Sequence, residues 1–83
     1  MNISQNEIEK IVNVVREQLS DNFYPHTEAI YNGNLMIKLY SEVSLFEINE
    51  IQNRIEGWDI FLGAGLGAGN DTYIELIFSV YTY

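Results

Sequence analysis

The spacing of apolar residues predicts that the chain begins with a helix. Ser4-Gln5-Asn6-Glu7 is typical of a capping box, in which Ser and Glu satisfy reciprocal backbone amides. Apolar residues then recur at i, i+3, i+4, i+7 and i+11, which forms one helical stripe. The stripe consists of Ile8, Ile11, Val12, Val15 and Leu19. We expect this helix to end near Leu19 or Ser20 and to be followed by a loop over 20–26, anchored by Phe23 and Tyr24.

A strand-like period of two follows from Thr27 onward. Asn32-Gly33 suits the positive φ angles of a type I′ turn, so the pattern predicts a hairpin that pairs Tyr31 with Asn34. Ile30, Leu35, Ile37 and Leu39 then share the core face, and Tyr31, Met36, Lys38 and Tyr40 share the other. This register also places Glu28 on the core face. Either the strand begins after Glu28, or Glu28 lies at an edge that water reaches.

A second capping box, Ser44-Leu45-Phe46-Glu47, starts a second predicted helix. Gly57 is a natural helix terminator, so this helix is expected over Leu45 to Glu56. Its stripe consists of Leu45, Ile48, Ile51, Gln52 and Ile55. Two strands are expected after it, over Trp58–Leu62 and Thr72–Tyr81. The glycine-rich residues 63–71 join them, and whether 63–69 is a mobile loop or part of a bulged strand stays open.

These elements predict an α+β domain with the order helix-hairpin-helix-hairpin (αββαββ). Two helices are expected to pack on one face of a four-stranded, mainly antiparallel sheet, which is a cyclic permutation of the split βαβ arrangement. The chain is expected to form a single domain over 1–83. The patterning leaves the strand order open.

The charge balance points away from nucleic acid and toward basic protein surfaces. Twelve acidic residues against four basic ones give a net charge of −8. Phosphate binding needs clustered cations, whereas Lys10, Arg16, Lys38 and Arg54 are well separated. We therefore predict a protein partner and no direct binding of nucleic acid.

Several chemistries lack the residues that they require. Cysteine is absent, so thiolate sites and disulfides are excluded, and His26 is the only histidine. The alternating glycines of 63–69 precede a strand-like segment rather than the helix that phosphate cradling needs. We predict no enzyme, no metal and no cofactor. The apolar runs are short and no leader pattern is present, so we expect a cytoplasmic protein without membrane association.

Two sets of side chains are candidates for partner binding. Acidic residues gather around the second helix, where Arg54 is the local counter-charge: Glu42, Glu47, Glu50, Glu56 and Asp59. A second set lies on the sheet face opposite the helices: Tyr31, Met36, Tyr40, Phe61, Tyr73, Ile77 and Tyr81. An apolar face of this kind favours association with a partner or a second copy, unless a segment of the chain folds over it. The simpler interpretation of the acidic set is a solvated helix surface.

This short acidic chain, with capped helices and a tyrosine-rich sheet, resembles the small phage-encoded anti-defence proteins, anti-CRISPR proteins in particular. The resemblance lies in its length, its net charge and its general composition. The resemblance covers the whole chain, rests on no motif and transfers no site residues. It implies an inhibitor in a bacterial host cell that docks on the basic, nucleic-acid-binding surface of an enzyme such as a CRISPR effector, as a phosphate mimic. The alternative is a structural or assembly module that self-associates through the tyrosine-rich face or an edge strand.

Overall fold

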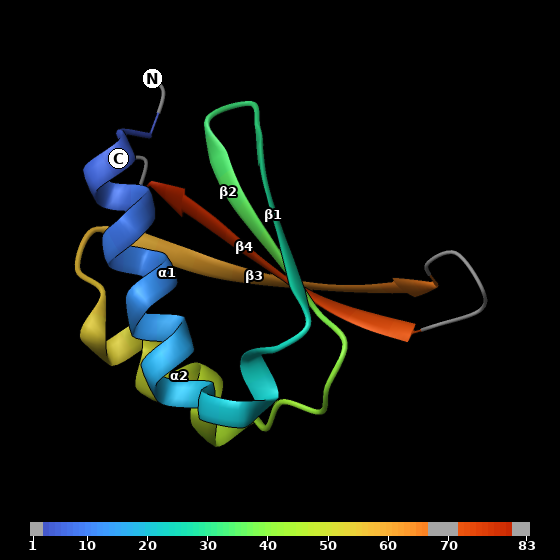
Figure 1. Cartoon of the computed structure of the whole chain (residues 1–83). Helices are drawn as coiled ribbons and strands as arrows, with labels where there is room; N and C mark the ends of the chain where they lie inside the picture. The colour runs from blue at the N-terminus through green and yellow to red at the C-terminus, as the bar shows by residue number, and fades with distance from the viewer. Residues whose placement is uncertain (1–2, 67–71, 81–83) are drawn as a thin grey trace.

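Two helices pack on one face of a four-stranded antiparallel sheet in the computed structural model, which describes residues 3–66 and 72–80 (Figure 1). The elements are α1 (Gln5–Leu19), the short 3₁₀ helix η1 (Ser20–Phe23), β1 (His26–Tyr31), β2 (Asn34–Leu39), α2 (Leu45–Arg54), β3 (Trp58–Leu66) and β4 (Thr72–Val80). The strand order is β1-β2-β4-β3, and every neighbouring pair is antiparallel. The predicted α+β class is confirmed.

Both helices begin with the capping boxes that the sequence predicts. The hydroxyls of Ser4 and Ser44 accept hydrogen bonds from the backbone N–H groups three residues on, at 3.2 and 3.1 Å. The carboxylates of Glu7 and Glu47 accept from the serine N–H groups in return. α2 ends at Arg54, two residues before the expected end, because the backbone at Ile55 is already extended and the positive φ of 84° falls at Gly57.

The register of the first hairpin is the predicted one. Tyr31 pairs with Asn34 and Ile30 with Leu35, across a turn in which Asn32 and Gly33 have φ angles of 52° and 79°. Glu28 pairs with Ile37 and is exposed. The sequence left open whether the strand begins after Glu28 or includes it at an edge that water reaches. The structure shows the latter, because Glu28 lies within β1 and β1 is an edge strand.

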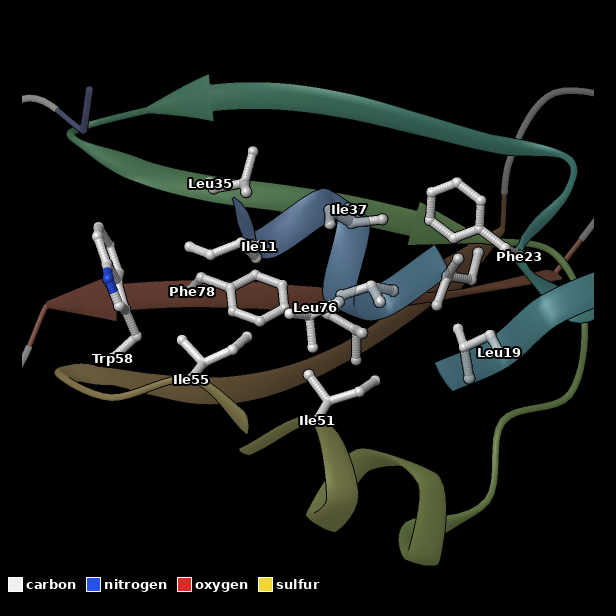
Figure 2. Close-up of a cluster of buried hydrophobic side chains, with 13 residues drawn as sticks. Ile11, Leu19, Phe23, Leu35, Ile37, Ile51, Ile55, Trp58, Leu76 and Phe78 are labelled. Atoms are coloured by element: carbon white, nitrogen blue, oxygen red, sulfur yellow. The ribbon is translucent and has the colours of Figure 1, made fainter. Parts of the chain in front are cut away.

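The hydrophobic core lies between the helices and the inner face of the sheet, which we define as the face that carries Leu35, Ile37, Leu76 and Phe78 (Figure 2). Phe23 is buried in this core and anchors the segment after α1, as expected, whereas Tyr24 is exposed. The prediction that Leu45 belongs to the buried stripe is wrong, because this first residue of α2 is 76% exposed. The remaining core residues are Ile11, Val14, Val15, Leu19, Leu39, Ile51, Ile55 and Trp58.

β3 is longer than the sequence predicts. It does not end at Leu62 but continues through Gly63, Ala64 and Gly65 to Leu66, all paired with β4. Of the expected glycine-rich connection, only residues 67–71 remain, and these lie outside the described residues. Figure 1 shows the far end of the β3–β4 hairpin extending beyond the helices. Leu62 and Leu66 lie on the inner side of β3 and are exposed. Leu62 lies on an edge strand beside buried Leu76, and Leu66 lies in the extended part of β3.

Candidate functional site

The helix-free face of the sheet, which we call the outer face, carries an apolar row that crosses all four strands. Ala29 of β1 pairs with Met36 of β2, which pairs with Ile77 of β4. Ile77 in turn pairs with Phe61 of β3. Directly paired residues in antiparallel strands point to the same face, so these four side chains form a continuous strip. At the end of this strip, Phe61 is 55% exposed.

Tyr73 organises the aromatic part of the outer face. Its ring makes an edge-to-face contact with Tyr40, with centroids 6.1 Å apart, and Nζ of Lys38 lies 4.7 Å from its centroid. The ring also lies across Gly65: a Cβ atom added at that glycine would be 2.6 Å from the Tyr73 hydroxyl oxygen. The glycine in β3 therefore makes room for a tyrosine from the neighbouring strand, and the tyrosine in turn positions a cation.

The second row of the outer face is charged at its centre. Lys38 pairs with Glu75, and these two are flanked by Thr27 on β1 and Gly63 on β3. Opposite charges on directly paired residues attract each other. Lys38 and Glu75 nevertheless form no ion pair: Nζ of Lys38 lies over the ring of Tyr73, whereas the Glu75 carboxylate lies over Gly63 of β3.

A concave groove of about 550 Å³ opens at the β1 side of the outer face. Its lining is Thr27, Glu28, Ala29, Ile30, Tyr31, Met36, Lys38 and Glu75. Of the predicted aromatic set, Tyr31 and Met36 line it, and Tyr31 is 66% exposed. The other groove residues were not predicted as a site from the sequence, although the pattern did place the charged Glu28 at a core-facing position.

The structure distributes the predicted acidic residues over more than one surface. Glu42 lies in the β2–α2 connection and lines a small hollow beside Tyr40 and Tyr73. Glu47 is held in the capping box, and Glu50 is half-buried on α2. Exposed Glu56 lies in the turn between α2 and β3, one residue before Gly57.

Asp59 projects from the outer face, because it alternates with the core residue Trp58 and pairs with Ser79. It therefore does not share a face with the carboxylates of α2, which packs on the inner side of the sheet. Of the predicted aromatic set, Tyr31, Met36, Tyr40, Phe61, Tyr73 and Ile77 do share the outer face. Tyr81 lies outside the described residues.

His26 was predicted to be a loop residue, but it is the first residue of β1. Its ring packs on Phe23, with centroids 4.0 Å apart, and Nε2 lies 2.8 Å from a carboxylate oxygen of Glu28. Within residues 3–66 and 72–80, no group of three or more acidic or histidine side chains could hold a metal ion. The histidine is a structural residue of the first hairpin.

Comparisons with protein-family models, with characterised proteins and with solved structures gave no match. No helix in the described part of the chain is both long and apolar enough to cross a membrane.

Proposed function

We propose that this protein is a small acidic inhibitor that binds a basic, nucleic-acid-binding surface of a host enzyme, such as a CRISPR effector. Its carboxylates take the positions of nucleic-acid phosphates. The observation that carries the proposal is the net charge of −8, from twelve acidic residues against four basic ones. Among the described residues, the ion pair that involves a Lys or Arg side chain is Arg54 with Glu17, at 2.6 Å, and Nε2 of His26 lies 2.8 Å from a carboxylate oxygen of Glu28.

The carboxylates of Glu42, Glu50, Glu56 and Asp59 make no ion pair with any described residue. They are therefore available to cationic groups of another molecule. Uncompensated charge of one sign raises the association rate with an oppositely charged surface, and dissolved salt weakens the effect. Nucleic acid should compete for the same surface of the enzyme, while the protein itself binds no nucleic acid.

Charge reversal of two of these residues tests the proposal. The partner is captured from a bacterial lysate at low salt, released at high salt, identified and purified. Against this purified enzyme, Glu50→Lys with Asp59→Lys should slow association on the order of tenfold at low salt, with a smaller loss at high salt.

The matched control is Glu9→Lys with Asp21→Lys, which makes the same change in net charge at exposed positions outside the predicted set. If both double variants associate equally slowly, only the net charge matters. If the Glu50 and Asp59 double variant binds like the wild type at low salt, the phosphate-mimic proposal is wrong.

Self-association through the outer face is a second candidate function. The apolar row favours it, and so does the adjacency of Lys38 and Glu75, which lets two copies related by a two-fold axis exchange these charges. Sedimentation velocity at increasing concentration tests it. A sedimentation coefficient that stays at the monomer value over the whole range would contradict it.

A further inference from the structure

We propose that the open edge of β1 binds an extended segment of the basic partner as a fifth strand, with a Lys or Arg side chain of that segment opposite Glu28. The inference rests on the proposed function, because it takes the partner to be a protein with a basic surface. It adds the binding mode and places the contact at the first hairpin, away from α2.

The backbone of β1 is available for strand addition. β1 ends the sheet order, and every residue of the strand after His26 is exposed. The tight turn makes Tyr31 and Asn34 a hydrogen-bonded pair, and such pairs alternate along an antiparallel ladder. His26, Glu28 and Ile30 therefore direct their backbone N–H and C=O groups toward the open edge.

The groove adjoins this edge. Its lining includes the five consecutive residues 27–31, which alternate between the inner and outer sides of the sheet. Met36, Lys38 and Glu75 complete the lining, so the groove runs from β1 over the adjoining part of the outer face. Ala29 has a small side chain, so a long side chain from an added strand can pass over it to Met36. A volume of about 550 Å³ is large enough for several residues of a peptide.

The charges of the groove favour a cationic occupant. The charged residues of its lining are two carboxylates, Glu28 and Glu75, and one cation, Lys38, whose Nζ lies over the Tyr73 ring. The partner of Glu28 within the described chain is the imidazole of His26. A cation directly opposite Glu28 on an added strand forms a favourable cross-strand pair. A carboxylate there is repelled, and the charge of −8 adds to that repulsion.

A second copy of this chain fits the edge less well. Antiparallel pairing of two β1 strands centred on Glu28 would place two carboxylates opposite each other, between two molecules that each carry −8. An inward-pointing charge is a known protection of edge strands against pairing with copies of themselves. The same carboxylate selects a basic strand from another protein.

Synthetic peptides provide the probe. The test peptide is the heptapeptide acetyl-Thr-Val-Thr-Arg-Thr-Val-Thr-amide, which can place Arg opposite Glu28 and its valines opposite His26 and Ile30. A second peptide has Glu in place of Arg. A third keeps Arg but carries N-methylvaline at both valines, which removes the N–H groups that would bond to β1. Binding to the full-length protein is followed by NMR amide shifts.

The Arg peptide should bind saturably, with the largest amide shifts at residues 26–31, and N-methylation should weaken it by about tenfold or more. The variant Glu28→Lys should reverse the preference between the Arg and Glu peptides. Ile30→Pro, which removes an outward N–H, should weaken the Arg peptide, whereas Ile30→Val, which keeps it, should not.

Equal affinity of the N-methylated peptide, an unchanged preference in Glu28→Lys, or no saturable binding of the Arg peptide would overturn the inference. Its failure is distinguishable from failure of the proposed function. If Ile30→Pro binds the purified partner like the wild type while the Glu50 and Asp59 reversals weaken it, the inhibitor proposal stands and strand addition is wrong.

Discussion

The inner and outer faces of the sheet are built from alternate residues of the same strands, yet they differ in what covers them. On β4, Leu76 and Phe78 are fully buried beneath the helices, whereas the neighbouring Ile77 remains partly open to solvent. Because strand residues alternate between faces, one set of positions can stabilise the fold while the other is free to bind. Substitutions at adjacent residues should therefore have separable effects.

The largest expected difference in the free energy of unfolding is between the variants Leu76→Ala and Ile77→Ala. Leu76 is completely buried, so its truncation removes apolar contacts and leaves a cavity, at a cost of about 2–5 kcal/mol in the free energy of unfolding. Ile77 is of similar volume but only half-buried, so its truncation should cost less than half as much. Urea denaturation of both variants measures the two values, and equal losses would mean that the outer face is covered in solution.

A smaller effect is expected where α2 is tied to the edge strand β3. The Gln52 side chain donates a hydrogen bond to the Trp58 carbonyl at 2.6 Å and accepts one from the Ile60 N–H at 3.2 Å. Gln52→Ala leaves both half-buried backbone groups without this partner, so it should cost about 1–3 kcal/mol. Gln52→Glu keeps the acceptor for the Ile60 N–H but turns a second carboxylate oxygen toward the Trp58 carbonyl, so it should also lower the temperature of thermal unfolding. If Gln52→Ala unfolds at the wild-type temperature, the contact does not hold β3.

The smallest effect on stability is expected on the outer face, for Phe61→Ser. This side chain is more than half exposed, so its removal should change the free energy of unfolding of the monomer by no more than about 0.5 kcal/mol. If two copies associate through the outer face, the same variant should abolish concentration-dependent sedimentation. A variant that is strongly destabilised in dilute solution would contradict the assignment of Phe61 to an uncovered surface.

The sequence predicts those parts of the fold that depend on local signals. Ser4 and Ser44 identify the helix starts, and Asn32-Gly33 fixes the register of the first hairpin. The α+β class follows from the order of these elements. The strand order β1-β2-β4-β3 does not follow, because it depends on long-range pairing between β2 and β4.

The extent of β3 and the composition of the site were less predictable, for physical reasons. Glycine usually weakens a strand, but here the side chain of Tyr73 fills the space that Gly65 leaves. Asp59 is near α2 in sequence, whereas its alternation in β3 turns it to the other face. Most of the predicted aromatic set does share one face, because the alternation of residues along a strand assigns each side chain to a face. The groove at β1 forms beside an edge strand. The only sign of that edge in the sequence was Glu28, a charged residue at a core-facing position of the predicted strand.

The placement of the aromatic residues gives the protein an optical reporter of its interior. Trp58, the only tryptophan, lies in the core beside α2, whereas Tyr31, Tyr40 and Tyr73 lie on the outer face. Tryptophan emission therefore follows the integrity of the interior, and the three outer-face tyrosines make up half of the six tyrosines that absorb. Unfolding of the core can thus be followed by the emission of one tryptophan without a label.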